Sequence, residues 1–191
     1  RVYLLGNGGS AADAQHIAAE LVGHLRHDRR PLPALALTTD TSALTAIGND
    51  YEFKDVFSRQ VRALGRAGDV LIGISTSGNS KNVLEAVQAA KQMNILTLGL
   101  LGRGGGKIAP VCDHAIIVPT DDTQRVQECH ILIGHIWMEL IERSVMRPIE
   151  NSADLTIVVA FGLSLILQES VRATFGATPQ RILDPIGITF P

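Results

Sequence analysis

Four side chains that are suited to metal binding lie in two stretches that we expect to be helices. His16 and Glu20 are four residues apart in an alanine-rich stretch, so their side chains share one face of a helix. Gln127 and His135 belong to a later stretch that is otherwise apolar. Two imidazoles and one carboxylate are a common ligand set for zinc. These residue types therefore indicate a candidate zinc site, although a single histidine on an apolar helix is more often structural.

The spacing of Gln127 and His135 limits how such a site can be built. Eight residues span about 12 Å of a straight helix, so one metal ion cannot easily bind both from the same helix. Either Gln127 precedes the regular helix, or one ligand crosses a subunit interface. We expect a shared site in an oligomer.

A segment rich in serine and threonine, residues 75–80, follows a strand pattern and precedes a helical pattern. Free backbone N–H groups and the positive end of the helix dipole at such a junction suit a phosphate dianion, and the hydroxyl side chains add donors. No Gly-Lys-Ser/Thr sequence occurs, so a nucleoside triphosphate loop is not supported. The segment predicts a site for a phosphate monoester of a small molecule. The alternative is a turn whose hydroxyl groups only cap the helix.

The glycine-rich segment 6–10 also follows a strand pattern and, with Ala11, fits the G-x-G-x-x-A pattern of dinucleotide-binding proteins. Those proteins place an acidic residue at the end of the second strand, about 20 residues further on. Asp40 comes later than this and lies beyond Thr38 and Thr39. A nicotinamide or flavin protein is therefore the weaker interpretation of this segment.

The elements that must position these segments alternate between strands and helices, as in a doubly wound parallel α/β sheet. We expect five strands, at residues 2–5, 34–37, 70–74, 95–100 and 115–118. Ser10 is placed to cap the first of four main helical stretches, which we expect at residues 11–25, 51–64, 81–93 and 123–143. Ligands bind at the carboxyl ends of the strands in such sheets, and both loop segments follow strands.

The bulk composition is that of a soluble globular domain. Of the 191 residues, 46% are hydrophobic and 19% are charged, with a net charge of −2 and no basic stripe. We therefore expect no nucleic-acid partner, and no membrane partner for the globular part. Cys112 and Cys129 are far apart and neither belongs to a C-x-x-C pair, which favours a reducing, cytoplasmic environment.

Several segments together resemble the phosphoheptose (sedoheptulose-7-phosphate) isomerases, a family of SIS-domain proteins. They occur in the order and spacing of that family from residue 1 to about residue 145, and they comprise residues 6–16, 33–40, 48–50, 73–80 and 125–128, together with His135. The family has a leading helical segment that has no counterpart before Arg1. We therefore expect that N-terminal helix to be missing from this chain.

The resemblance implies an SIS fold of the flavodoxin-like type and a cytoplasmic homotetramer with sites at subunit interfaces. It implies one zinc ion per subunit, bound by His16, Glu20, Gln127 and His135. The implied reaction converts sedoheptulose 7-phosphate to D-glycero-D-manno-heptose 7-phosphate, a precursor of lipopolysaccharide heptose, with Glu20 as the base and His135 as the acid. The resemblance implies substrate binding by Asn7, Gly8, Gly9, Ser10, Glu20, Asn49, Asp50, Ser75, Thr76, Ser77, Ser80 and Gln127.

Non-catalytic relatives provide the alternative interpretation. SIS proteins that bind a phosphosugar for regulation, or that associate with the replication initiator, share the glycine loop and the segment around His16. They lack the residues that match Glu20 and His135, and both of these are present here. The resemblance therefore favours the enzyme.

The chain changes character after about Met146. Residues 147–191 resemble part of the permease subunit of branched-chain amino-acid ABC transporters, and their apolar core is shorter than the roughly 20 residues that span a bilayer. We predict that residues 1–146 form the catalytic SIS domain and that this tail contributes nothing to catalysis. The alternative is a tail helix that packs where the missing N-terminal helix would lie.

Overall fold

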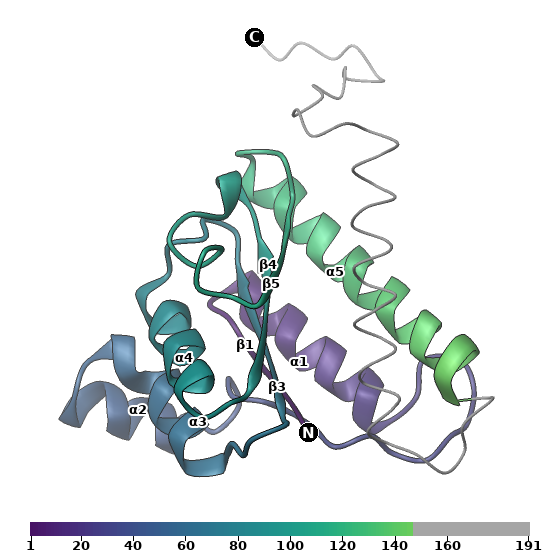
Figure 1. Ribbon diagram of the computed structural model, residues 1–191, viewed down its shortest axis with the longest axis horizontal. Helices are drawn as coiled ribbons and strands as arrows, with labels where there is room; N and C mark the ends of the chain where they lie inside the picture. Colours follow the sequence, from purple (N-terminus) through teal and green to yellow (C-terminus); the bar gives the residue numbers. More distant parts are fainter. Residues whose placement is uncertain (147–191) are drawn as a thin grey trace, which may run out of the picture.

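The computed structural model describes residues 1–146, which form a five-stranded parallel sheet with helices on both faces (Figure 1). Each neighbouring pair of strands is parallel, and the spatial order is β2-β1-β3-β4-β5. The predicted doubly wound, flavodoxin-like sheet is confirmed. Its winding reverses between β1 and β3, where sheets of this type bind ligands. The strands are β1 Val2–Leu5, β2 Ala34–Ala36, β3 Val70–Ser75, β4 Leu96–Leu101 and β5 His114–Ile117.

The central strand β1 shows why this sheet is covered on both faces. Val2 and Leu4 belong to one apolar core, whereas Tyr3 and Leu5 belong to the other. Successive side chains of a strand point to opposite faces, so a strand with helices on both sides is apolar throughout. A short run of apolar residues without alternation therefore predicted a buried strand correctly.

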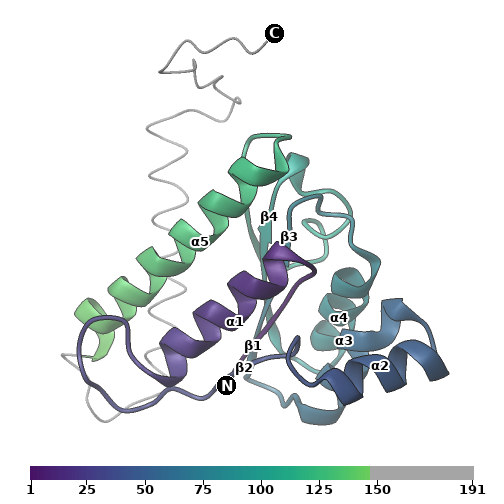
Figure 2. The ribbon, with the colours of Figure 1, turned by 180° about the vertical axis from the view of Figure 1, so that it is seen from behind.

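The helices divide between the two faces of the sheet. α1 and α5 lie side by side on one face, and α3 and α4 pack together on the other (Figures 1 and 2). A π-helical turn, η3 (Ile141–Met146), continues α5, and a 3₁₀ turn, η2 (Arg103–Gly105), follows β4. The bounds of the four helices are α1 Gly9–Val22, α3 Val56–Leu64, α4 Lys81–Gln92 and α5 Thr123–Leu140.

One helix, α2 (Thr41–Asp50), was not predicted from the sequence. It begins after Asp40, whose side chain accepts a hydrogen bond from the Ala43 N–H, and none of its residues is buried. Its apolar pattern is limited to Leu44 and Ile47, which are partly buried against the core, and so short a pattern does not by itself reveal a helix. The helix that we expected at 51–64 starts later, as the 3₁₀ turn η1 (Phe53–Asp55) followed by α3.

The start of α1 also differs from the prediction. The residue that precedes the helix is Gly8 and not Ser10, which is buried within the first turn. Gly8 has a φ of 56°, in the left-handed region that glycine adopts without strain. The helix therefore begins inside the glycine segment, so that the N–H groups of its first turn face the carboxyl ends of the strands.

Residues 147–191 lie outside the described part of the chain, so the proposed domain boundary at 146 and the role of the tail remain predictions. Within residues 1–146, no helix is both long enough and apolar enough to cross a membrane.

Asp113, which directly precedes β5, is hydrogen-bonded to Thr97 on β4 at the amino end of the sheet. Its carboxylate accepts hydrogen bonds from the N–H and hydroxyl of Thr97, at 2.9 and 2.7 Å, and from Lys91 at 2.7 Å. Burial alone would raise the pKa of Asp113, but the hydrogen bonds from Lys91 and Thr97 outweigh it. The pKa therefore lies below its ordinary value of 3.8.

We expect Asp113→Asn to lower the free energy of unfolding by about 1–2 kcal/mol near pH 7, because a charged acceptor is lost. The folded-state pKa is depressed, so the carboxylate stabilises the protein above its unfolded-state pKa. This stabilisation is lost as the pH falls below about 4 and through the folded-state value. Urea denaturation at a series of pH values should show the difference between wild type and variant shrinking in that range. A difference independent of pH would contradict this assignment.

Candidate functional site

His16 and Glu20 on α1 come together with His135 on α5, where the two helices contact each other. His16 Nε2 lies 2.9 Å from His135 Nε2 and 3.4 Å from Glu20 Oε1. One ligand atom from each residue lies within 4.8 Å of the other two, an arrangement that could hold a metal ion. These three residues are called the HEH group below. The prediction that the first helix shares a site with the long later helix is therefore consistent with the geometry.

The donor atoms of the HEH group fit a divalent cation. Two imidazole nitrogens 2.9 Å apart repel each other unless one carries a proton or both face a cation. Glu20 Oε2 is buried and has no hydrogen-bond partner in the described part of the chain, which is costly unless a cation or proton satisfies it. Zinc bonds of about 2.0–2.2 Å in a tetrahedron place ligand atoms about 3.3 Å apart. The separations of 2.9 and 3.4 Å lie on either side of that spacing.

A glycine on α5 allows the two helices to bring these side chains together. A Cβ built at Gly134 would lie 2.7 Å from Cδ1 of Ile17, which is fully buried. Ile17 follows His16 in the chain, and Gly134 precedes His135. The close approach at Gly134 therefore lies beside the two imidazoles. Sequence reasoning passed over this glycine, because a helical glycine carries no local sign of its packing partner.

The serine-rich loop 75–80 lies between β3 and α4, as predicted. Ser75 Oγ lies 2.9 Å from Ser80 Oγ and 3.5 Å from Ser77 Oγ, so three hydroxyl groups converge. Ser80 precedes α4, yet its side chain makes no capping hydrogen bond to the helix. The N–H groups at the start of the helix can therefore donate to an anion, apart from that of Val83, which donates to Asn82 Oδ1. The positive end of the helix dipole also favours an anion there. Thr76 and Ser77 are partly exposed and complete the loop.

The glycine loop 102–106 packs against the back of the serine-rich loop. Gly78 and Gly105 have φ values of 63° and 83°, and a Cβ at Gly78 would clash with the carbonyl group of Gly105. The N–H of Ile108 donates to Gly78 O at 3.0 Å, and the N–H of Lys107 donates to Asn79 Oδ1 at 3.1 Å. The second loop therefore fixes the shape of the first through backbone contacts that leave no space for side chains.

Asn82 connects the first glycine loop to α4, and sequence reasoning did not identify it. Its side-chain amide exchanges two hydrogen bonds with that of Asn7, both 2.8 Å long. Asn82 Oδ1 also accepts from the Val83 N–H at 3.0 Å, and only 3% of Asn82 is exposed. Asn7, which the family resemblance assigned to the substrate, is therefore held in position from behind. The serine-rich motif ends at Ser80, so the sequence gave no indication that Asn82, the second residue of α4, supports the neighbouring loop.

Gln127 lies away from the HEH group within one chain. It is inside α5, which starts at Thr123, so the alternative in which it precedes the regular helix is wrong. Its side chain contacts Gly9, where a Cβ would clash with it. Gln127 therefore lies beside the first turn of α1, near the glycine-rich segment 6–10. His135 lies two turns further along α5.

Asn49 and Asp50 are also apart from the HEH group within one chain. They are exposed at the end of α2, where Asn49 Nδ2 donates to Asp50 Oδ1 at 2.9 Å. Both ribbon views place α2 on the opposite side of the molecule from α5 (Figures 1 and 2). Of the residues assigned by resemblance, the structure thus brings together three ligands at one place and the loop residues at another.

Other titratable side chains near these loops are held neutral by burial. His130 on α5 is fully buried, and burial lowers its pKa, so it differs from the accessible pair His16 and His135. Burial raises the pKa of Cys112 to about 11 and also raises that of Cys129. Both thiols therefore remain protonated at neutral pH, which argues against a thiolate nucleophile.

The chain is similar to known proteins in both sequence and fold. A model of the SIS domain matches residues 1–102. The phosphoheptose isomerase of Nitratiruptor sp. is 62% identical over 144 residues, 75% of this chain and 77% of that protein. That of Aquifex aeolicus is 59% identical over 145 residues, 76% of each protein. The solved phosphoheptose isomerase of Neisseria gonorrhoeae has a TM-score of 0.70 at 58% identity, covering 74% of this chain and 76% of that one. That of Francisella tularensis has a TM-score of 0.71 at 40% identity, covering 73% and 75%.

Gly78→Ala should weaken the binding of inorganic phosphate at least tenfold and lower the free energy of unfolding by about 2 kcal/mol, because a Cβ displaces the glycine loop. The matched control is Gly104→Ala. Gly104 has a φ of 70° but has no atom within 4 Å of its hypothetical Cβ. It therefore carries the backbone strain without the clash. Isothermal titration and urea denaturation measure the two effects, and equal losses in both variants would contradict the packing argument.

Gly134→Ala should reduce the affinity for Zn²⁺, because the added methyl group meets Ile17 and separates α1 from α5. A substitution in an exposed helix would instead stabilise the protein by about 0.5–1 kcal/mol. Gly48→Ala on α2 tests this, since its Cβ would meet only Val56 Cγ1, at 3.9 Å. Melting temperatures with and without Zn²⁺ give both readouts. A stabilising effect of Gly134→Ala with unchanged zinc affinity would overturn the prediction.

Proposed function

Since the chain belongs to the phosphoheptose isomerase family of SIS-domain proteins, we propose that it interconverts sedoheptulose 7-phosphate and D-glycero-D-manno-heptose 7-phosphate. The observation that carries this proposal is the clustering of His16, Glu20 and His135 in a chain about 60% identical to such isomerases. The regulatory alternative requires the loss of residues that match Glu20 and His135. Both are present, and they lie in one group.

The phosphate of the substrate binds at the serine-rich loop. Ser75, Ser77 and Ser80 direct hydroxyl groups to one place, and Thr76 and the first turn of α4 add donors. A phosphate monoester is a dianion, so the helix dipole and the free N–H groups compensate its charge. Asn7, Gly8, Gly9 and Ser10 form the neighbouring loop for the sugar hydroxyl groups.

The isomerisation moves one proton between carbons and one between oxygens. A base removes a proton from C1 of the ketose and returns it to C2, while O1 loses a proton and O2 gains one. We assign the carbon-to-carbon transfer to Glu20 and the oxygen transfers to His135. Their positions on two packed helices hold both groups against one end of the same substrate.

Zinc is the cofactor that the donor set favours, with one ion per subunit bound by His16, Glu20 and His135. When bound, zinc supplies positive charge that stabilises negative charge on the substrate oxygens. Coordination would lower the basicity of the Glu20 carboxylate. Glu20 has two oxygens, one facing His16 and one without a hydrogen-bond partner in the described part of the chain, so one could hold the ion while the other accepts the proton.

A homotetramer with sites at subunit interfaces explains why one chain separates the expected site residues. Gln127 contacts Gly9 and lies about 12 Å along α5 from His135. Asn49 and Asp50 lie on a helix remote from α5. A neighbouring subunit can bring these side chains to the HEH group, with Gln127 as a fourth ligand. Leu132 on α5 is 57% exposed, as expected of a face that another subunit covers.

The purified 191-residue chain should isomerise sedoheptulose 7-phosphate, and it should lose this activity after chelation and regain it with Zn²⁺. Product formation is followed by chromatography of the two heptose phosphates. Restoration by Zn²⁺ but not by Mg²⁺ would support imidazole ligation, because Mg²⁺ prefers oxygen ligands. Turnover that survives complete chelation would refute the zinc proposal while leaving the isomerase assignment in place.

Glu20→Gln should abolish turnover, by at least 10³-fold, because an amide cannot accept the carbon-bound proton. The fold should be preserved, as judged by circular dichroism and by unchanged phosphate binding. Glu85→Gln on α4 is the matched control and should retain wild-type turnover. Substantial activity in Glu20→Gln would rule out Glu20 as the base.

A further inference from the structure

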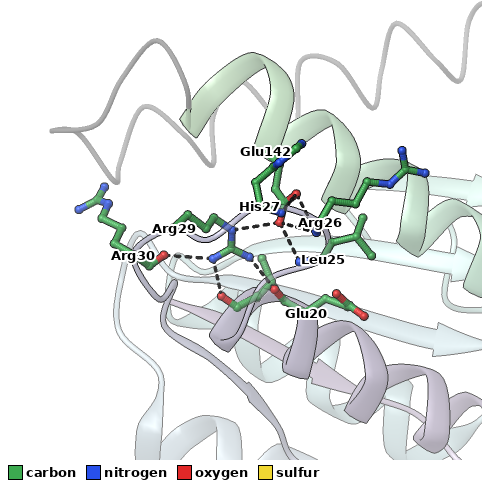
Figure 3. A network of polar contacts seen from close by, with 8 residues as sticks. Glu20, Leu25, Arg26, His27, Arg29, Arg30 and Glu142 are labelled. Atoms are coloured by element: carbon green, nitrogen blue, oxygen red, sulfur yellow. Dashed lines mark hydrogen bonds and ion pairs between the residues drawn. The ribbon is translucent and has the colours of Figure 1, made fainter.

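A buried ion pair joins the loop after α1 to the end of α5 (Figure 3). The side chain of Arg29 is 7% exposed and that of Glu142 is 3% exposed, and Arg29 Nε lies 3.6 Å from Glu142 Oε1. Neither residue belongs to a motif that the sequence analysis singled out, and neither contacts the serine-rich loop. A buried ion pair contributes little net stability, because the loss of hydration of both charges offsets much of their attraction. The burial of this pair therefore calls for another explanation.

Glu142 holds the loop that follows α1. Its carboxylate accepts hydrogen bonds from three consecutive backbone N–H groups, those of Leu25 at 2.7 Å, Arg26 at 3.1 Å and His27 at 3.3 Å. Burial alone would raise the pKa of Glu142, but these hydrogen bonds and Arg29 outweigh it, so the pKa lies below its ordinary value. The carboxylate therefore stays charged at neutral pH and acts as a fixed anchor on the π-helical turn.

Arg29 holds the end of α1 itself. Its guanidinium donates to the carbonyl oxygens of Glu20 at 2.5 Å, Leu21 at 3.0 Å and Arg30 at 3.1 Å. The carbonyl groups in the last turn of a helix have no partner within the helix, so a cation there completes their hydrogen bonds. One of these carbonyls belongs to Glu20, whose side chain is part of the HEH group. Figure 3 shows the guanidinium between that carbonyl and Glu142.

The two helices are therefore joined at two points. One is the HEH group, and the other is the Arg29–Glu142 pair. Glu142 follows His135 by seven residues, close to two helical turns, so both point toward α1. A slide of α1 along α5 would break the hydrogen bonds that Glu142 accepts from the loop after α1 and would separate Arg29 from Glu142. The pair thus determines how far along the helix axis Glu20 stands from His135.

We propose that Arg29 and Glu142 are positioning residues that fix the register of α1 against α5 and so preorganise the HEH group. This inference rests on the proposed metal-binding and proton-transfer roles of that group. A planar guanidinium can bind two carbonyls and a carboxylate together, whereas an ammonium group cannot reproduce that geometry. Groups behind metal ligands orient them, and their loss commonly reduces metal affinity or activity 10–100-fold.

The test compares Glu142→Gln and Arg29→Lys in the 191-residue chain. We expect about 10–100-fold weaker Zn²⁺ affinity in competition titrations, and a fall in kcat with little change in KM. Binding of inorganic phosphate should be unchanged, because the serine-rich loop lies elsewhere. Asp113→Asn is the matched control: it also removes a carboxylate that accepts a backbone N–H, but it lies at the amino end of β5. It should lower stability and leave Zn²⁺ affinity and kcat unchanged.

A second readout does not depend on metal. The imidazole NMR signals of His16 and His135 in the zinc-free protein should shift in Glu142→Gln and stay unchanged in Asp113→Asn. Unaltered imidazole signals and zinc affinity in folded Glu142→Gln and Arg29→Lys would overturn the inference and leave the pair a helix cap only. A wild-type chain that binds no Zn²⁺ would refute the metal proposal, whereas the imidazole signals would still decide the positioning role.

Discussion

The close packing of α1 against α5 is the constraint on which the HEH group depends. Gly134 admits Ile17 at a distance where no side chain would fit, and this contact lies beside both imidazoles. Two turns further on, the Arg29–Glu142 pair joins the same helices again. Packed helices with two such contacts cannot slide or rotate independently, so the three ligand atoms stay within reach of one another.

The serine-rich loop, where we propose that phosphate binds, depends on a different constraint: glycines at its contact with the loop 102–106 leave no side chain between the two backbones. The serine-rich loop and the glycine loop behind it approach so closely that Gly78 and Gly105 meet backbone to backbone. Each adopts a positive φ that a residue with a Cβ would resist. The Asn7–Asn82 amide pair links the glycine-rich segment 6–10 to the start of α4, which follows the serine-rich loop. Rigid loops at the carboxyl ends of parallel strands can present several donors to one anion without reorganising.

The family identifies the activity, and we propose the loop cluster and the HEH group as the parts of this chain that carry it out. Isomerisation within a sugar phosphate requires one region that binds the constant phosphate and another that handles the reacting carbons. We assign the loop cluster to the first role and the HEH group to the second. The loop cluster lies where β1, β3 and β4 end, whereas the HEH group lies on α1 and α5. The proposed sharing of sites between subunits follows from the residues that one chain leaves apart, above all Gln127 and the pair at the end of α2.

Local patterns account for what could be predicted. Short apolar runs revealed the five strands, of which β1 and β3 are buried throughout, and clusters of glycine and serine revealed the loops that follow β1 and β3. The i, i+4 spacing placed His16 and Glu20 on one helical face. α2 escaped prediction, because only the short pair Leu44 and Ile47 marks its apolar face. The first turn of α1 was misplaced, because Gly8 takes the capping position that Ser10 is chemically suited to fill.

The sequence by itself thus determined the sheet, its order of elements, the family and the residue types of the site. Only the tertiary structure decided which of those residues meet. It joined His135 to His16 and left Gln127 at Gly9, and it placed Asn82, Gly134, Arg29 and Glu142 in supporting positions. The physical reason is that these contacts link residues far apart in the chain. They depend on how closely two helices pack, which no local pattern of residues encodes.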